Sequence, residues 1–244
     1  MRLLLLAGTQ EARHIALALS REDRLTLTVS LATSERRPQP YGWPVRIGGF
    51  GSEAAFRDYL DREGVQGIID ATHPFAARVS ERSARVAREM GLDYVQFLRP
   101  AWVPREGDRW TFLNDEAEAK AHIPEGSTVF VAIGRRELSK LANLESCTLI
   151  CRIRDQTSDP FPFPHGRYLY QRAPFTVEEE VALFRRLGID WILERNAGGG
   201  GSLPKIDAAR QLGLPVAMVR RPPQPEGLKI STVAETVAWV RRRL

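Results

Sequence analysis

Hydrophobic residues follow two alternating patterns along the chain. Short continuous apolar runs, such as residues 3–7 and 67–69, are typical of strands buried on both faces. Between these runs, apolar residues recur at the three- and four-residue spacing of an amphipathic helix. A helical stretch closes at a glycine, and an apolar run follows within two residues, at Gly64, Gly91, Gly188 and Gly213. Helices that alternate with buried strands predict an α/β fold with mainly parallel sheets.

Several segments have recognisable ends. Residues 74–90 are predicted as a helix with Pro74 in its first turn. Thr232 and Glu235 have the spacing of a capping box, and the apolar stripe after them extends the predicted last helix to Leu244. The proline-rich segment 154–168 predicts a long surface loop.

The chain divides into two sets of helices and strands. The first covers residues 1 to about 100, and the second runs from about 126 to 244. Residues 100–125 mix prolines and tryptophans with a short strand and a short helix, as expected of a linker or crossover. We therefore expect an N-terminal domain over residues 1–125, linker included, and a C-terminal domain over residues 126–244.

Composition adds one functional hint. Of the 35 basic residues only four are lysines, and the net charge is +5. Coding bias is one explanation for the many arginines, and the alternative is function: arginine makes planar contacts with carboxylate and phosphate, which suits an anionic ligand. Basic runs interleaved with aromatic residues are absent from the sequence, which disfavours nucleic acid as a partner.

The sequence also favours a cytoplasmic location without a membrane span or a metal. The N-terminal apolar run is too short for a signal peptide, and no stretch approaches the roughly 18 apolar residues that a membrane span needs. Cys147 and Cys151 share one strand-like run about 13 Å apart, too far for a disulfide. The four histidines are scattered without ligand spacing, so no metal site is expected.

Ligands of open parallel sheets bind at the carboxyl ends of strands, where four loops of the first half are expected to lie. Gly8 and Thr9 follow the first strand, and the helix start with the Thr9 hydroxyl predicts an anion site or a plain turn. Gly51 allows close approach of a ligand, or only a tight turn. After the second strand come hydroxyls and guanidiniums that favour a 2′-phosphate and hence NADP, at Thr33, Ser34, Arg36 and Arg37. Glu35 points the other way, and a solvated turn is the alternative.

The joint after the apolar run at 67–69 carries unusual chemistry. Asp70, Thr72 and His73 stand together at a strand end, which makes His73 a candidate acid–base group, with a structural histidine as the alternative. In the second half, Arg135 and Arg136 follow a strand. The glycine run 198–201 predicts an anion-binding nest or a flexible loop, with Lys205 adding charge.

Five motifs in order over the whole chain resemble the precorrin-6A reductases of cobalamin biosynthesis. They are residues 8–12, the stretch DATHPFA at 70–76, Gly134-Arg135, the glycine-rich loop leading to Lys205, and PVAMVRRP at 215–222. DATHPFA is the most specific of them. Residues 195–198 depart from the family pattern, which has a lysine, an acidic or amide residue and then a serine there.

The resemblance implies NADPH-dependent reduction of a double bond of precorrin-6A to give precorrin-6B. It implies two Rossmann-like domains that can exchange a strand, with cofactor and substrate in a cleft between them. The substrate is a polycarboxylate tetrapyrrole, and neighbouring enzymes of the pathway are candidate partners. Two alternatives stay open: another NADP-dependent oxidoreductase, for which no Tyr-x-x-x-Lys pair is found, or a non-enzymatic nucleotide- or tetrapyrrole-binding module.

Site residues follow from position and resemblance together. His73 is the candidate proton donor. The expected cofactor-binding residues are Gly8, Thr9, Thr33, Ser34, Arg36, Arg37, Gly51, Thr72 and His73. The expected substrate-binding residues are Arg135, Arg136, Asn196, Gly198, Gly199, Gly200, Gly201 and Lys205.

Overall fold

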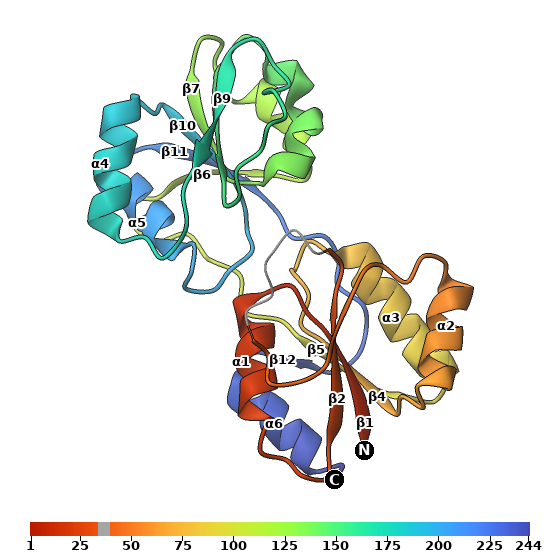
Figure 1. Ribbon diagram of the computed structural model, residues 1–244. Coiled ribbons are helices and arrows are strands. Elements are labelled where there is room, and N and C mark those ends of the chain that lie inside the picture. Colours follow the sequence, from red (N-terminus) through yellow and green to blue (C-terminus); the bar gives the residue numbers. More distant parts are fainter. Residues whose placement is uncertain (34–39) are drawn as a thin grey trace. The chain divides into compact units, whose positions relative to one another are not determined.

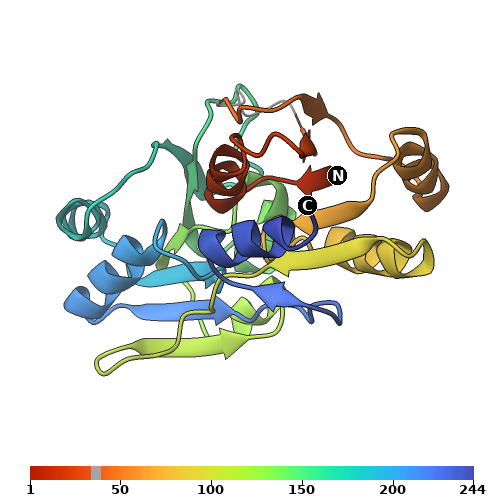
Figure 2. The same ribbon diagram turned by 90° about the horizontal axis from the view of Figure 1, so that it is seen from below.

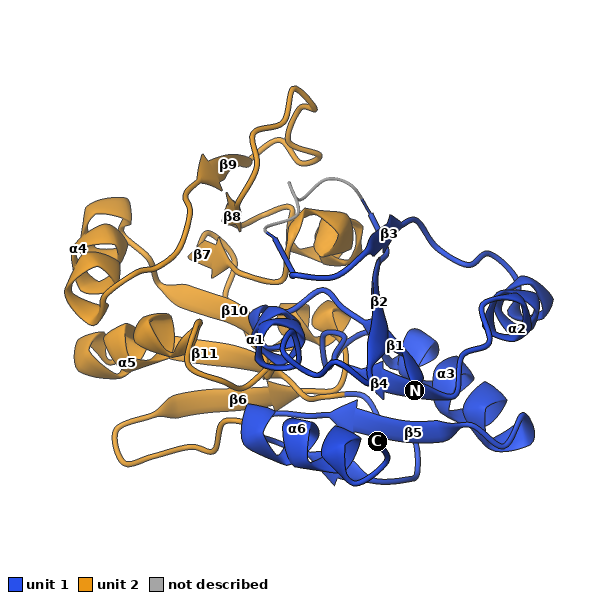
Figure 3. Ribbon diagram, turned by 60° about the horizontal axis from the view of Figure 1, so that its bottom comes forward, with its two compact units in different colours: residues 1–100, 222–244 blue, residues 101–221 orange. Residues whose placement is uncertain are grey.

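The computed structural model describes residues 1–33 and 40–244 and divides into two compact units. The first unit comprises residues 1–100 and 222–244, and the second comprises residues 101–221 (Figure 3). Each unit is built on one six-stranded parallel sheet. The predicted α/β class with two parallel sheets is therefore confirmed.

The first sheet has the strand order β12-β5-β4-β1-β2-β3. Read from β3 to β12, with β12 counted as the sixth strand, this order is 3-2-1-4-5-6, the order of dinucleotide-binding folds. Its strands are β1 (Arg2–Leu6), β2 (Thr26–Leu31), β3 (Val45–Ile47), β4 (Gly67–Asp70), β5 (Asp93–Phe97) and β12 (Lys229–Ile230). Its helices are α1 (Gln10–Ala18), α2 (Glu53–Arg62), α3 (Ala77–Glu89) and α6 (Val233–Arg241).

Alternation along β1 explains why the chain opens with four leucines. Leu3 and Leu5 pack in one apolar cluster with residues of α1 and α6, whereas Leu4 and Leu6 pack in another with residues of α2 and α3. The two pairs of helices accordingly cover opposite faces of the sheet (Figure 1 and Figure 2). A strand covered on both faces buries every side chain, which gives a continuous apolar run.

The second sheet has the order β6-β11-β10-β7-β8-β9. Its strands are β6 (Arg109–Leu113), β7 (Thr128–Val131), β8 (Thr148–Ile153), β9 (Gly166–Tyr170), β10 (Trp191–Arg195) and β11 (Pro215–Val219). The remaining elements are the 3-10 helices η1 (Glu116–Ala121) and η2 (Arg135–Leu144) and the α-helices α4 (Val177–Leu187) and α5 (Leu203–Leu212). Counted from β7, this sheet repeats the 3-2-1-4-5 order of the first.

In each sheet the sixth strand is not the one that follows the fifth along the chain. The strand that follows β5 along the chain is β6, which pairs with β11 in the second sheet. The strand that follows β11 is β12, which pairs with β5 in the first sheet. The expected strand exchange is thus confirmed, and it is reciprocal. The compact units consequently differ from the ranges expected from sequence, since residues 101–125 belong to the second and residues 222–244 to the first.

Three local expectations are corrected by the structure. Helix α3 begins at Ala77 rather than Pro74, because residues 73–76 form a turn that the Ala76 N–H closes on the His73 carbonyl at 2.7 Å. Strand β9 begins within the predicted loop 154–168: Gly166 pairs with Leu149, whose carbonyl oxygen would lie 2.7 Å from a Cβ at position 166. Helix α6 ends at Arg241, although its predicted capping box, Thr232 with Glu235, is confirmed.

Two further observations concern the residues that the structure describes. Cys147 and Cys151 are buried free thiols, the first directly before β8 and the second within it. Among residues 1–33 and 40–244, no helix has the length and apolar character needed to cross a membrane.

Candidate functional site

The carboxyl ends of β1 and β4 bring two predicted loops together. These neighbouring strands lead to helices on opposite faces of the first sheet, which makes this position the topological switch point. The Thr9 hydroxyl donates to the Ala71 carbonyl at 2.8 Å and accepts the Ala12 N–H at 3.2 Å, so it caps α1 while joining the two loops. Of the predicted residues, Gly8, Thr9, Thr72 and His73 lie on these loops.

Asp70 holds the second loop in its conformation. Its carboxylate is completely buried; one oxygen accepts the N–H (3.0 Å) and hydroxyl (2.7 Å) of Thr72, and the other accepts the Tyr94 hydroxyl (2.9 Å). Burial and the charge of Asp70 raise the pKa of Tyr94, so this phenol stays protonated and remains a donor. Tyr94 was missed from sequence because a tyrosine in a strand gives no sign of its partner.

His73 lies at the surface of this loop. Its side chain is exposed, and its Nδ1 accepts the Phe75 N–H at 3.3 Å. When Nδ1 accepts, the neutral ring carries its proton on Nε2, where it can be donated. The position and the tautomer both suit an acid–base group.

Arg46 organises the carboxyl ends of β2 and β3. Its guanidinium donates to the Ser30 hydroxyl (2.9 Å) and the Gly48 carbonyl (2.7 Å), and it lies 3.8 Å above the centre of the Phe50 ring. The only signal for Arg46 in the sequence is a charged residue inside a short strand before two glycines. Thr33 is half-buried after β2, and the predicted Ser34, Arg36 and Arg37 lie outside the described residues.

At the carboxyl ends of β7 and β10, the second unit has its own switch point, where four charged side chains meet. Arg195 at the end of β10 bonds Glu116 (2.5 Å) and Glu137 (2.8 Å), and Lys140 lies 3.1 and 3.2 Å from the same two carboxylates. Burial alone would raise the pKa of Glu116, but hydrogen bonds from its backbone, Arg195 and Lys140 outweigh burial and lower it. The cluster therefore neutralises itself and fixes η1 and η2 against β10.

Asn196 is bonded within the protein rather than open to a ligand. Its amide oxygen accepts the Trp102 N–H at 2.8 Å, and its amide nitrogen donates to the Trp102 carbonyl at 2.9 Å. The Trp102 indole donates to the Gly199 carbonyl at 2.9 Å. Both groups hold the segment after β10, while Gly200 and Gly201 are exposed, with no heavy atom within 4 Å of an added Cβ.

Lys205 is likewise engaged. It is 7% exposed and forms an ion pair with Glu194, which is 4% exposed. Burial raises the pKa of Glu194, and the neighbouring ammonium of Lys205 opposes that rise. The structure gives Lys205 a role inside the unit, and its contact with substrate stays a prediction.

The two predicted arginines of η2 differ in their surroundings. Arg135 donates to the Thr157 hydroxyl at 2.6 Å and pairs with Asp159 at 2.5 Å, which ties η2 to the loop after β8. Arg136 is exposed. Both follow Gly134, whose φ of 89° belongs to the left-handed region.

Comparison with known proteins covers nearly the whole chain. The model of the family described as precorrin-6x reductase CbiJ/CobK matches residues 2–241. The precorrin-6A reductase of Rhodococcus erythropolis is 39% identical over 241 residues, which cover 98% of this chain and 97% of that protein. The precorrin-6A reductase of Rhodobacter capsulatus is 38% identical over 240 residues, covering 98% and 95%. The chain belongs to the precorrin-6A reductase family.

The solved structure of the CobK precorrin-6A reductase agrees with this assignment. It matches with a TM-score of 0.92 at 37% identity and covers 99% of this chain and 96% of that one. The resemblance inferred from the five motifs is therefore confirmed, and the chain is an oxidoreductase of the precorrin-6A reductase family.

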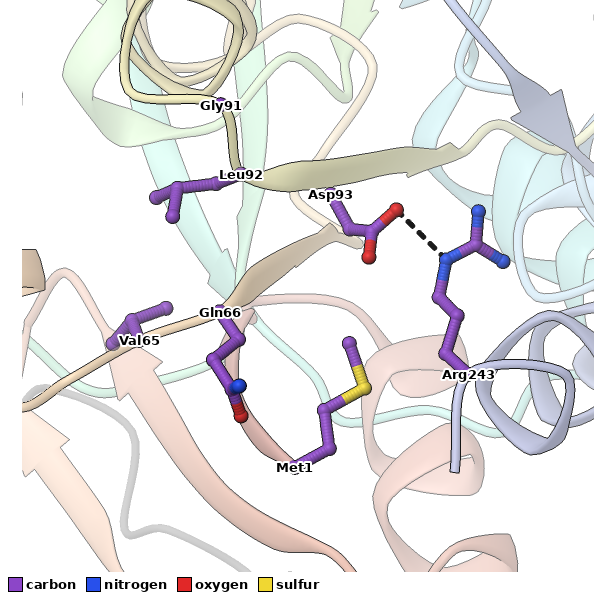
Figure 4. A pocket seen from close by; sticks show the side chains of 7 residues that line it. All are labelled: Met1, Val65, Gln66, Gly91, Leu92, Asp93 and Arg243. Carbon is purple, nitrogen blue, oxygen red and sulfur yellow. Dashed lines mark hydrogen bonds and ion pairs between the residues drawn. The ribbon is translucent and has the colours of Figure 1, made fainter.

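A surface pocket lies at the amino ends of the strands of the first sheet, opposite the carboxyl ends where the cofactor is expected. It is lined by residues before or at the amino ends of β1, β4 and β5 and by the chain's last turn: Met1, Val65, Gln66, Gly91, Leu92, Asp93 and Arg243 (Figure 4). Arg243 bonds Asp93 across it at 2.8 Å. Ligands of such sheets bind at the carboxyl ends of the strands, so this pocket does not lie where the cofactor is expected.

Glu116→Gln should lower the free energy of unfolding of the protein by about 2 kcal/mol at neutral pH, since hydrogen bonds to charged groups contribute roughly that much. The pKa of Glu116 is lowered by folding, so its carboxylate stabilises the fold above its ordinary value of 4.5, and this contribution disappears as the pH falls through the lowered pKa. The difference from wild type should therefore shrink below about pH 4.

Urea unfolding at neutral and acid pH measures this effect. Glu125→Gln is the matched control, because Glu125 pairs with Lys120 at the surface and its loss should leave the midpoint unchanged. A Glu116→Gln difference of the same size at both pH values would contradict the assignment.

Proposed function

We propose that this chain, a precorrin-6A reductase by family, uses NADPH to reduce one double bond of the macrocycle and gives precorrin-6B. Family membership over residues 2–241 is the observation that carries this proposal. The 3-2-1-4-5-6 sheet with its β1–β4 switch point supports a dinucleotide as cofactor. When bound, NADPH supplies the hydride.

The loops at the carboxyl ends of the first sheet fit such a cofactor. Gly8 and Gly51 have φ of 143° and 69°, and a Cβ built on either would meet no heavy atom within 4 Å. Open space beside the backbone lets phosphates approach the amides, and the α1 N-terminus favours negative charge. Thr72 lies on the adjoining loop. For the 2′-phosphate, the proposed ligands are Thr33, Ser34, Arg36 and Arg37.

The second unit is proposed to bind the carboxylates of the tetrapyrrole. The residues proposed for this role follow the carboxyl ends of strands. They include the exposed Arg136, Gly200 and Gly201, and also Arg135. Buried Gly198 and half-buried Gly199 shape the same loop with φ of 66° and 77°. Asn196 and Lys205 are proposed to support it from within.

His73 is proposed to supply the proton. Reduction of a conjugated double bond adds a hydride to one atom and a proton to another, so a proton source is required at the site. The imidazole of His73 is exposed and accepts the Phe75 N–H at Nδ1, so its neutral form carries the proton on Nε2, from which it is proposed to pass to the substrate directly or through water.

The direct test mixes the purified protein with NADPH and precorrin-6A and follows the loss of NADPH absorbance. A product two hydrogens heavier than precorrin-6A, formed faster with NADPH than with NADH, supports the proposal. Oxidation of NADPH only with a smaller substrate would favour another oxidoreductase. Binding of NADPH or of precorrin-6A without oxidation would favour a binding module.

Gly8→Ala should weaken NADPH binding about tenfold, because its Cβ enters the space left for the cofactor and the left-handed backbone is strained. Gly91→Ala is the matched control: Gly91 also has positive φ, 67°, and open surroundings, but it lies at the amino edge of the same sheet. Titration calorimetry should show normal NADPH affinity for Gly91→Ala. Equal losses in both variants would mean that backbone strain alone causes the effect.

A further inference from the structure

The two segments that join the units are bonded to the loops, and in one case to the first turn of a helix, that follow the carboxyl ends of strands. In the first segment, Arg99 pairs with Glu11 of α1 at 2.8 Å, and three residues later Trp102 is held by Asn196 and Gly199 after β10. The segment is therefore bonded to the first unit at Arg99 and to the second unit at Trp102.

The second segment repeats this arrangement with different groups. On the side of the second unit, Arg221 donates to the carbonyls of Asn196 and Ala197, both at 2.7 Å. On the side of the first unit, Gln224 donates from its amide nitrogen to the Pro74 carbonyl at 3.0 Å and to the Pro222 carbonyl at 2.8 Å. Pro74 is the residue after His73.

Gln224 is itself firmly placed. Its amide oxygen accepts from Gln96 of β5 at 2.8 Å, and the Gln96 side chain is 4% exposed. Prolines at 222, 223 and 225 restrict the backbone on both sides. Pro225 is buried, and its carbonyl accepts from Lys229 of β12 at 2.6 Å. A donor on a stiff segment can fix the group that it bonds.

We propose that Gln224 is a positioning residue that holds the turn carrying His73. Thr72 is fixed from one side by Asp70, and the Ala76 N–H closes the turn on the His73 carbonyl. Gln224 adds a bond to this turn from the segment that returns from the second unit, through its amide nitrogen to the Pro74 carbonyl. The link to catalysis rests on the proposed role of His73.

Gln224→Met tests the proposal, because methionine keeps the length and volume of the side chain and removes its hydrogen bonds. Hydrogen exchange of the ligand-free protein should become about fivefold faster over residues 71–80, as expected when hydrogen bonds of ordinary strength are lost. In the reductase assay, kcat should fall about fivefold while KM for precorrin-6A changes less than about twofold.

Gln66→Met is the matched control. Gln66 accepts the Arg2 N–H at 2.9 Å at the amino edge of the same sheet, so this variant also loses one side-chain hydrogen bond. Exchange over residues 71–80 and kcat should stay at wild-type values. Gln224→Glu is the second variant: it keeps an acceptor for Gln96 but has no proton for Pro74, and it should change exchange and kcat in the same direction as Gln224→Met.

Unchanged exchange over residues 71–80 in both Gln224 variants would overturn the proposal, whatever the activity. Faster exchange with unchanged kcat would also overturn it, since the turn would then be held without consequence for the reaction. If the wild-type protein does not reduce precorrin-6A, the proposed function fails, and the exchange data still decide whether Gln224 holds the turn.

Discussion

His73→Ala should lower kcat for the reduction of precorrin-6A about a hundredfold, the usual size of a general acid's contribution. The exposed ring at the β1–β4 switch point accepts the Phe75 N–H at Nδ1, so the neutral ring carries its proton on Nε2, the atom proposed to deliver it. Alanine removes that proton source but leaves the Asp70, Thr72 and Gln224 bonds that shape the turn. Steady-state kinetics with NADPH and precorrin-6A measure the loss.

Two comparisons make the His73 result specific. His122→Ala is the control, since His122 is an exposed histidine at the end of η1 in the second unit, and its kcat should match wild type. Calorimetric titration with NADPH separates proton delivery from cofactor binding, because a pure proton donor leaves the affinity unchanged. A decrease in kcat of less than about tenfold would show that His73 is not the acid.

Lys205→Met should lower the free energy of unfolding by about 3–5 kcal/mol, because it leaves the carboxylate of Glu194 buried without its partner. Glu194 is 4% exposed and lies at the end of β10, and Lys205 reaches it from α5. The double variant Lys205→Met, Glu194→Leu removes both charges and should recover most of the loss. Urea unfolding of the two variants provides the measurement.

The surface pair Lys120–Glu125 provides the control for Lys205. Lys120→Met removes the same type of side chain from an exposed ion pair and should leave the unfolding midpoint unchanged. If Lys205→Met is as stable as wild type but binds precorrin-6A weakly, the lysine contacts substrate and its pairing with Glu194 is dispensable.

The bonds proposed to position the site loops are made by the two segments that connect the units. In a dinucleotide-binding sheet the sixth strand ordinarily follows the fifth, but here the chain leaves each unit after its fifth strand and enters the sheet of the other. At these exits the loops after the strands are bonded by Trp102, Arg221 and Gln224. Arg99 bonds Glu11 in the first turn of α1. The loops that carry the predicted site residues are thus held by the exchanged segments.

The sequence by itself determined the elements and the family. Leu3–Leu6 and the glycine-closed helices indicated parallel α/β sheets, because burial on both faces and helix termination depend on residues close together in the chain. The same local character identified the Thr232–Glu235 capping box. The stretch DATHPFA predicted the family for an analogous reason, since its seven residues are contiguous and can be recognised without knowledge of the fold.

Only the tertiary structure decided the partners of individual side chains. Thr9 with Ala71, Asn196 with Trp102 and Lys205 with Glu194 join residues whose meeting depends on strand order and register. Proline at 74 permits a helix start, but the turn closed by Ala76 moved that start to Ala77. Strand β6 completes the second sheet by pairing with β11, and β12 completes the first by pairing with β5. These pairings join segments far apart in the chain, so they depend on the folded sheets and not on local sequence.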